Sequence, residues 1–225
     1  MSAKINLKPL IPTITTFLCF YTIGMFLLLK IGNYDFSVYL NPNHSCIADI
    51  FFKYITHLGD GLIAFLIVIV LFFIRQDYGL MTLISLLTTT VITQFLKRII
   101  FIDRFRPSNI FDELIKAGKW HVVEGVHLHD KFSFPSGHTA TVFCIGILIA
   151  FLINSRVWSI FTVILISIVG FSRVYLSQHF LADILFGSLI GTLISFLVYY
   201  FLSIPMLKFS SKFSLHRRLN IKNGK

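Results

Sequence analysis

The stretch SRVYLSQHFLADILFGSLIGTLISFLVYYFL, residues 172–202, combines the two features that decide the fold. Its second part, residues 182–202, is apolar after Asp183. As a helix this part is about 30 Å long, the thickness of the hydrocarbon core of a bilayer. Its first part carries Arg173, His179 and Asp183, whose side chains are costly to place inside a membrane without a function. The stretch therefore predicts a transmembrane helix with functional polar residues at its beginning.

The composition of the whole chain also indicates a membrane protein. Of the 225 residues, 56% are hydrophobic and 13% are charged, whereas a soluble domain has about 25% charged residues. A chain this apolar cannot cover itself with polar surface, which argues against a soluble protein. The net charge of +10 does not indicate a nucleic-acid partner, because the charges are scattered between apolar runs. The cysteines Cys19, Cys46 and Cys144 show no close spacing and predict no disulfide.

Six apolar runs are candidates for membrane spans, which need about 17–25 residues. The second run is the weakest, since His57 and Asp60 interrupt its beginning. The first run lacks a small-residue cleavage pattern after it and is predicted to be a span, not a signal peptide. The predicted fold is an all-α polytopic membrane protein with six transmembrane helices. They cover residues 11–29, 55–74, 78–96, 139–153, 157–171 and 182–202.

Six spans place both termini on one side of the membrane, and the charge differs between the two sides. The side of the termini carries ten Lys and Arg residues and one acid, Asp77, for a total of +9. The other side carries ten basic and nine acidic residues, for a total of +1. The two sides carry equal numbers of Lys and Arg residues. The rule that cytoplasmic segments are rich in Lys and Arg applies best to short links and to segments that flank spans, and these favour a cytoplasmic location for the termini. We therefore expect a basic cytoplasmic tail over residues 208–225 and an exoplasmic connection between residues 97 and 134.

Three polar clusters interrupt the apolar pattern, each at the exoplasmic end of a predicted span. They cover residues 97–107, 134–139 and 172–183. The 33 residues from Thr139 to Phe171 form about 50 Å of helix, enough for a crossing, a turn and a crossing back. The second and third clusters then emerge on the same side, so the clusters are expected to converge.

The second and third clusters contain the residue types of nucleophilic and acid–base catalysis. His179 and Asp183 are four residues apart, so on a helix they share a face and the carboxylate reaches an imidazole nitrogen. Such a carboxylate fixes the tautomer and leaves the other nitrogen free to attack. His138 is the candidate general acid. Ser136 and Gly137 stand at a predicted helix start, where backbone N–H groups suit an anion.

Four cations add positive charge to this set: Lys97, Arg104, Arg106 and Arg173. Arginine is especially suited to bidentate contacts with phosphate. Phosphoryl transfer needs a positioned nucleophile, neutralised oxygens and protonation of the leaving group. Because the cations can supply the charge that Mg²⁺ provides elsewhere, we predict no metal and no cofactor.

Together the motifs resemble the phosphatidic acid phosphatase type 2 superfamily of lipid phosphate phosphatases. The matching patterns are Ser-Arg-x5-His-x3-Asp over residues 172–183 and Pro-Ser-Gly-His over residues 135–138. The resemblance covers residues 59–202, the expected catalytic core of a membrane domain over residues 1–207, and includes the six-span layout. It implies a phosphohistidine on His179, oriented by Asp183, with His138 protonating the leaving group. It also implies that the phosphate is held by Lys97, the first-motif arginine, Ser136, Gly137 and Arg173.

The first motif of that family, Lys-x6-Arg-Pro, is altered in this chain. Arg104 stands seven residues after Lys97, but Phe105 replaces the proline, and the pair Arg106-Pro107 comes two residues later. On a continuing helix Arg104 stays near the face of Lys97, whereas Pro107 favours a turn at Arg106. Both arginines are candidates, and Arg106 is slightly favoured because its proline fixes the exit from the span.

The exoplasmic connection has two further features. Residues 110–120 have apolar residues at helical spacing and predict an amphipathic interfacial helix over the mouth of the site, with Trp120 as its membrane anchor. The remaining candidates for a metal are three histidines and an acid, whose spacing does not match a closed zinc site. They are His121, His127, His129 and Asp130.

Structural alternatives exist for some of these residues. His138, His179 and Asp183 could form a hydrogen-bond network at span ends without catalysis. Asp60, in Gly59-Asp60-Gly61, either lines the site or caps a helix.

We interpret the chain as a membrane lipid phosphatase that acts on monoester or diphosphate head groups at the exoplasmic face of a bacterial inner membrane. Undecaprenyl diphosphate, phosphatidylglycerol phosphate and lipid A phosphates are the candidate substrates. The alternatives are a lipid-to-lipid phosphotransferase of the same family and a non-catalytic transporter of anionic lipids. The expected partners are the lipid substrate and the bilayer, with no nucleic acid, and no oligomeric state is predicted.

Overall fold

The computed structural model describes residues 10–153 and 155–222, and their side chains as far as Met206. In this part of the chain every regular element is a helix, as predicted. The long helices are α1 (Leu10–Ile31), α4 (Gly61–Ile74), α5 (Gln76–Phe95), α8 (Gly137–Ile153), α9 (Arg156–Tyr175) and α10 (Leu181–Lys222). The shorter elements are α2 (Asn33–Leu40), α3 (Cys46–Ile55), the 3₁₀ turn η1 (Thr56–Gly59), the π-helical turn η2 (Leu96–Ile100), α6 (Pro107–Ile110) and α7 (Asp112–Lys116).

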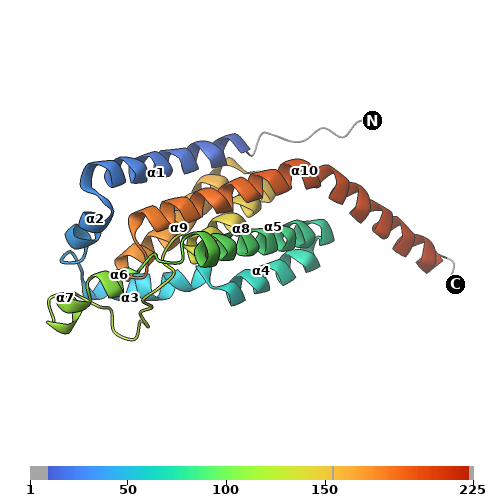
Figure 1. Ribbon diagram of the computed structural model, residues 1–225. Coiled ribbons are helices and arrows are strands. Elements are labelled where there is room, and N and C mark those ends of the chain that lie inside the picture. Colours follow the sequence, from blue (N-terminus) through green and yellow to red (C-terminus); the bar gives the residue numbers. More distant parts are fainter. Residues whose placement is uncertain (1–9, 154, 223–225) are drawn as a thin grey trace.

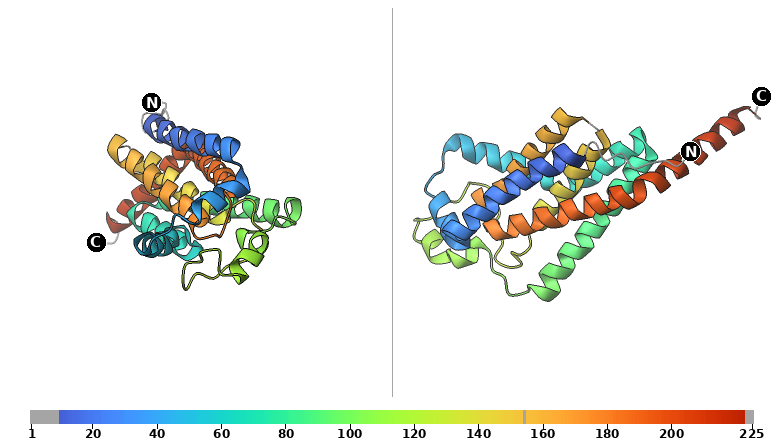
Figure 2. Two further views of the ribbon diagram at one scale, coloured as in Figure 1. Left: turned by 90° about the vertical axis from the view of Figure 1, so that its left-hand side faces the viewer. Right: turned by 90° about the horizontal axis from the view of Figure 1, so that it is seen from above.

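The long helices lie side by side along the bundle, and α3 leads into α4 at one side of it (Figures 1 and 2). α1 begins and α10 ends toward one end of the bundle, whereas α2, α6 and α7 lie at the opposite end, which we call the loop end (Figure 1). α8 occupies the centre of the bundle, where it packs against α5, α9 and α10 and most of its side chains are buried.

The outside of the bundle is apolar, as expected for a protein surrounded by lipid. Large apolar side chains of α1, α4 and α9 are exposed, among them Leu29 (80%), Phe73 (85%) and Val157 (74%). In water such a surface would be unfavourable, whereas hydrocarbon tails are an equally apolar neighbour. The chain is an integral membrane protein, as its composition predicts.

Within the described residues, four of the six predicted spans are helices long and apolar enough to cross a bilayer, and a fifth joins them if a bent pair of helices counts as one span. The four helices are α1, α5, α9 and α10, and the bent pair consists of α3–η1 and α4. α8, at the predicted fourth span, has 17 residues and is shorter than the others. Because most of α8 is enclosed by other helices, this helix need not match the full thickness of the hydrocarbon. A sixth crossing by α8 therefore stays a prediction.

The predicted second span is not one helix. A single helix over residues 55–74 was expected, but α3–η1 and α4 are inclined at 53° to each other. The break falls at Gly59-Asp60-Gly61, where Asp60 has an extended backbone (φ −68°, ψ 142°). Two glycines around a residue that favours caps and turns make a weak helix. The prediction of a continuous helix was wrong for this reason.

The connection between α5 and α8 is less helical than predicted. In place of one helix over residues 110–120 the chain forms the short helices α6 and α7. The Trp120 side chain is 7% exposed, stacks on Phe111 with 4.1 Å between ring centroids, and donates from Nε1 to Ser177 Oγ (3.0 Å). The prediction of Trp120 as a membrane anchor is wrong, because the indole finds both aromatic surface and a polar partner inside the protein.

α8 and α10 approach each other closely because α10 presents two glycines to α8. A Cβ on Gly187 would lie 2.5 Å from the Ser136 carbonyl oxygen, and a Cβ on Gly191 would overlap the Ala140 carbonyl oxygen. Small residues four apart allow the backbones of membrane helices to come close together. This contact sets the position of α8, which follows the second polar cluster, against α10, which begins in the third.

Replacing Gly191 by Ala is expected to destabilise the bundle, because the added methyl group meets backbone atoms of α8. Forcing extra volume into a packed interior costs about 1–3 kcal/mol, so the melting temperature is expected to fall by several degrees in detergent, followed by tryptophan fluorescence. Gly61→Ala is the matched control, since in the described part of the chain a Cβ there has nothing within 4 Å. Equal melting temperatures for the two variants would contradict the close contact.

Candidate active site

The three polar clusters meet at the loop end of the bundle. The Ser136 N–H donates to the Asp183 carbonyl oxygen (3.0 Å), which joins the second cluster to the third. Arg106 Nη1 donates to the Gln178 carbonyl oxygen (3.1 Å), which joins the first cluster to the third. The convergence predicted from helix lengths is confirmed. We call the joined set the polar site: Lys97, Arg106, Ser136, Gly137, His138, Arg173, His179 and Asp183.

His179 and Asp183 form a buried hydrogen-bonded pair. The Nδ1 atom of His179 lies 3.2 Å from Oδ2 of Asp183, and the two side chains are 2% and 4% exposed. The same oxygen accepts hydrogen bonds from the Phe180 N–H (2.9 Å) and from Ser133 Oγ, so the carboxylate is fixed in place.

The pair forms for a different reason from the one predicted. His179 lies in the turn before α10 and not on a helix, while Asp183 stands in the first turn of α10. A carboxylate at this position can reach back to the residues that precede the helix. The contact between the two side chains is therefore observed, but the helical spacing given as its cause is wrong.

The surroundings of His179 keep its imidazole neutral. Burial lowers the pKa of His179 well below its usual value of 6.5, and the charges of Arg106 and Lys97 lower it further. Because the Asp183 carboxylate can only accept a hydrogen bond, Nδ1 carries the proton and Nε2 keeps its lone pair. A neutral imidazole with a free Nε2 is a nucleophile.

Three cations of the polar site surround this pair. Lys97, in the π-helical turn η2, and Arg106 are each 9% exposed. The Arg173 side chain donates from Nη1 to Thr56 Oγ1 (3.0 Å), but its buried Nε has no hydrogen-bond partner among the described residues. A buried donor without a partner is unfavourable, and an anionic ligand would satisfy it.

The structure places Arg106, and not Arg104, in the polar site. Pro107 begins α6 and holds Arg106 in an extended conformation (φ −91°, ψ 167°). From there the Arg106 side chain turns inward and its Nε donates to the Lys131 carbonyl oxygen (2.9 Å). Burial lowers the pKa of Arg106, although its guanidinium stays charged at neutral pH. The Arg104 side chain is exposed and lines a neighbouring cavity.

The beginning of α8 lies in the polar site. Ser136 is fully buried, and its Oγ accepts from the Thr139 N–H (3.3 Å), as an N-cap residue does. Gly137 leaves room for Lys97, whose Nζ lies 4.0 Å from where a Cβ would be. Lys97 therefore places a buried ammonium group beside the helix start that was predicted to bind an anion.

His138 is held by the bend between α3 and α4. Its Nε2 donates to the Thr56 carbonyl oxygen (2.6 Å), and its Nδ1 lies 3.6 Å from Oδ1 of Asp60. A Cβ on Gly59 would overlap the imidazole ring, so only glycine leaves space for His138 here. Within the described residues the Asp60 side chain makes no capping hydrogen bond to α4. Of the two roles considered for Asp60, the structure favours the one that faces the site.

Three residues connect the polar site although the sequence analysis did not select them. Thr56 contacts both His138 and Arg173. Oε1 of Gln178 accepts from Arg106 Nη1 (3.3 Å) and from Arg173 Nη2 (3.5 Å). The third, Ser133, donates to the carboxylate of the His179 pair. Gln178 could have been found from its place beside His179, whereas Thr56 and Ser133 reach the site only through folding.

A cavity of about 320 Å³ adjoins the polar site. Asp183 and Ser133 line it on the side of the site. Its wall also contains aromatic rings, among them Phe101, Phe134 and Phe186, and the charged residues Asp103 and Arg104. A cavity with both charged and aromatic walls suits a ligand with a charged head and an apolar body.

The arrangement can bind an oxyanion and transfer it to a nitrogen nucleophile, since donors and cations surround the place that Nε2 of His179 can reach. The one group of metal-ligand side chains found in the described part of the chain lies outside the polar site and consists of His44, Asp49 and His121. Of the other loop histidines, His127 and His129 contact each other, with 4.9 Å between ring centroids.

Comparisons with known proteins find phosphatases among the similar proteins. A family model described as the PAP2 superfamily matches residues 78–205. Phosphatidylglycerophosphatase B of Bacillus subtilis is 33% identical over 158 residues, which cover 64% of this chain and 70% of that protein. A lipid A 4'-phosphatase of Porphyromonas gingivalis is 29% identical over 44% of this chain and 40% of its own length. The crystal structure of a transmembrane PAP2 type phosphatidylglycerolphosphate phosphatase from Bacillus subtilis has a TM-score of 0.64 and 26% identity, over 87% of this chain and 96% of that one.

Binding of inorganic phosphate tests the different placement of the two arginines. Arg106→Gln is expected to weaken phosphate binding about 10–100-fold, because a hydrogen bond to a charged group contributes about 1.5–3 kcal/mol. Arg104→Gln is the matched control and is expected to bind phosphate as the wild type does. The measurement is calorimetric titration of the purified chain, and a larger loss for Arg104→Gln than for Arg106→Gln would reverse the assignment.

Proposed function

The chain belongs to the PAP2 superfamily, and we propose that it is a membrane lipid phosphatase that works through a phosphohistidine on His179. The observation that carries this proposal is the buried pair of His179 and Asp183 among three cations. The pair supplies a neutral nucleophile, and the cations supply the positive charge that a phosphate dianion needs.

In the first step, Nε2 of His179 attacks phosphorus as the bond between phosphorus and the lipid oxygen breaks. Asp183 holds the Nδ1 proton and stabilises the positive charge that develops on the imidazole. His138 enters this step as an imidazolium ion, donates a proton to the departing lipid oxygen and becomes neutral, so the lipid leaves as an alcohol, or as a lipid monophosphate if the substrate is a diphosphate. The products of this step are the free lipid and a phosphohistidine.

In the second step, water attacks the phosphohistidine, and the bond between phosphorus and Nε2 breaks. His138, which lost its proton in the first step, accepts one from the attacking water. Inorganic phosphate leaves, and both histidines return to their starting protonation states. Each step transfers the phosphoryl group in line, between an attacking and a leaving atom on opposite sides of phosphorus.

Lys97, Arg106 and Arg173 hold the oxygens of the transferred group, together with Ser136 and Gly137 at the beginning of α8. Lys97 and Arg106 are largely shielded from water, where their attraction for a phosphate dianion is strong. We therefore propose that the reaction needs no metal ion and no other cofactor.

The proposed substrate is a lipid phosphate that enters from the bilayer through the cavity beside the polar site. The relatives act on glycerophospholipid and lipid A phosphates according to their names, and phosphatidylglycerol phosphate is our first candidate. Undecaprenyl diphosphate and lipid A phosphate are the others. We further propose that α8 is the sixth crossing of a bacterial inner membrane, with both termini cytoplasmic and the polar site on the exoplasmic side.

Replacing His179 by Ala is expected to abolish phosphate release from phosphatidylglycerol phosphate, by at least about a thousandfold, because the nucleophile is lost. His127→Ala, an exposed histidine of the same end of the bundle, is the matched control and is expected to retain activity. Both are assayed in EDTA, in which the wild type is expected to stay active.

Each alternative function gives a different result in that assay. Phosphate release that depends on an added acceptor lipid would indicate a phosphotransferase. Release at the wild-type rate by His179→Ala would contradict the mechanism and leave the site a binding site for anionic lipids. Loss of wild-type activity in EDTA would contradict metal independence.

The pH dependence of kcat/KM tests the state of His179, which must be neutral to attack. Because burial and neighbouring cations lower its pKa, we expect activity to be retained on acidification through pH 6.5 and to be lost only below it. Arg106→Gln removes one of these cations and is expected to move the acid limb to higher pH. An acid limb at or above pH 6.5 in the wild type, or one unmoved in Arg106→Gln, would be inconsistent with this environment.

A further inference from the structure

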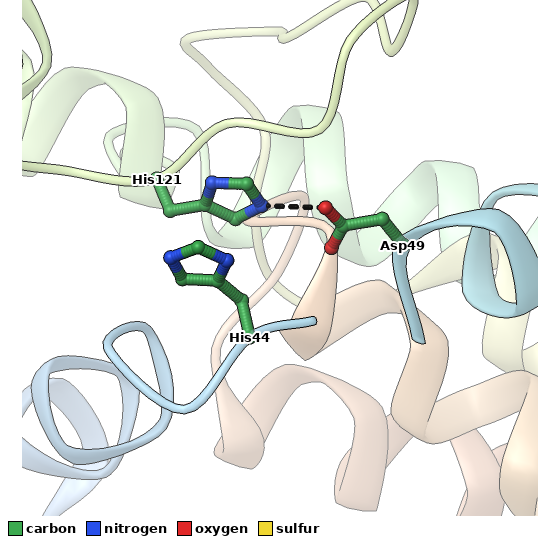
Figure 3. A group of neighbouring side chains, drawn as sticks. All are labelled: His44, Asp49 and His121. Carbon is green, nitrogen blue, oxygen red and sulfur yellow. Dashed lines mark hydrogen bonds and ion pairs between the residues drawn. The ribbon is translucent and has the colours of Figure 1, made fainter. Parts of the chain in front are cut away.

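We propose that His44, Asp49 and His121 form a binding site for a divalent transition-metal ion, with Zn²⁺ as the best fit, at the loop end of the bundle and outside the polar site. The three side chains come from the segment between α2 and α3, from α3 itself, and from the connection between α7 and α8 (Figure 3). Nothing in their sequence spacing indicates the group, since it assembles only in the fold.

The possible ligand atoms of the three side chains lie close together. One ligand-type atom from each lies within 4.8 Å of the other two, and Nε2 of His121 lies 3.0 Å from Oδ2 of Asp49 (Figure 3). In a tetrahedral zinc site, with bonds of about 2.0–2.2 Å, neighbouring ligand atoms lie a little over 3 Å apart. Shifts of side chains alone can therefore bring the three atoms to bonding positions.

Two of the ligands are oriented by further hydrogen bonds, as metal ligands usually are. Tyr175 on α9 donates from its hydroxyl to Oδ1 of Asp49 (2.6 Å), which leaves Oδ2 facing His121. The amide side chain of Asn41 accepts from the His121 N–H (3.0 Å) and donates to the His121 carbonyl oxygen (2.9 Å). These contacts hold the backbone of His121 and the carboxylate of Asp49 in place without using the metal-ligand atoms.

His44 is the ligand that has to move. Its ring is stacked on that of His121, with 3.6 Å between centroids and 4° between the planes (Figure 3). An imidazole lone pair lies in the plane of its ring, so two parallel rings cannot both aim at one ion. His44 is exposed and precedes α3 in the chain, so tilting its ring meets little resistance.

The donor set fits a transition metal better than a hard cation. Two imidazole nitrogens and one carboxylate oxygen suit Zn²⁺ and its neighbours, whereas Mg²⁺ and Ca²⁺ prefer oxygen ligands. The His121 and Asp49 side chains are 26% and 20% exposed, so water can reach the ion and fill its remaining positions.

A metal ion here would link three segments of the loop end. It would join α3 to the connection that leads into α8, and through Tyr175 also to α9. Arg173 of the polar site lies two residues before Tyr175, and Thr56 follows directly after α3. The expected role of the ion is therefore to stabilise the loop end, and it has no part in the proposed chemical steps.

Binding of Zn²⁺ to the full chain in detergent, with any affinity tag removed, tests the site by calorimetry. One Zn²⁺ per chain is expected, and His44→Ala and Tyr175→Phe are each expected to weaken binding by at least about tenfold. The matched control His127→Ala is expected to bind as the wild type does. Saturating Zn²⁺ is expected to raise the melting temperature of the wild type by about 5 °C, and of His44→Ala by much less.

Two results would overturn the proposal. One is the absence of Zn²⁺ binding to the wild type, and the other is binding of equal strength in the wild type, His44→Ala and Tyr175→Phe. The outcome is independent of the proposed phosphatase mechanism, because His179→Ala is expected to keep the Zn²⁺ site and His44→Ala is expected to keep phosphatase activity in EDTA.

Discussion

The structure depends on a cluster of like charges that only a ligand can balance. Lys97, Arg106 and Arg173 converge at the loop end, and among the described residues of the polar site Asp183 is the one buried carboxylate. Cations that are removed from water without enough anions are unfavourable. The pKa of His179 is lowered first by burial and then further by these cations, and the buried Nε of Arg173 has no hydrogen-bond partner among the described residues. A phosphate dianion brings the missing negative charge. The same cluster of cations therefore lowers the stability of the ligand-free protein and favours the protein with bound phosphate.

The helices around the cluster keep these charges in place. Close packing of α8 on Gly187 and Gly191 of α10 sets the helix that begins at Gly137 against the pair of His179 and Asp183. The bend after α3 brings Thr56 to His138 and to Arg173 at once. A straight second span would remove the contacts of Thr56, and bulkier residues at positions 187 and 191 would remove the close packing of α8 on α10. The packing of these helices therefore holds the three cations together against their electrostatic repulsion.

Much of this architecture could be predicted from the sequence, because apolar length and charged interruptions are local signals. The places of the six apolar helices and the convergence of the polar clusters follow from such signals, whereas the contact of His179 with Asp183 was expected for a wrong reason. The predictions that failed concern features that depend on contacts between residues far apart in the sequence. Trp120 is buried by Phe111 and Ser177, which no periodicity indicates. His179 contacts Asp183 from a turn, which spacing alone cannot distinguish from a helix. The bend at Gly59-Asp60-Gly61 and the glycines of α10 were visible in the sequence, and they are the signals that a better prediction would have used.

The most direct test of the mechanism is to trap the phosphorylated enzyme. The purified chain is mixed with phosphatidylglycerol phosphate labelled in its terminal phosphate, quenched rapidly in alkaline detergent and digested for mass spectrometry. We predict a label that is stable to alkali, labile to acid and located on His179. Rapid release of phosphate with no labelled protein, or a label on any other residue, would contradict a phosphohistidine at this site.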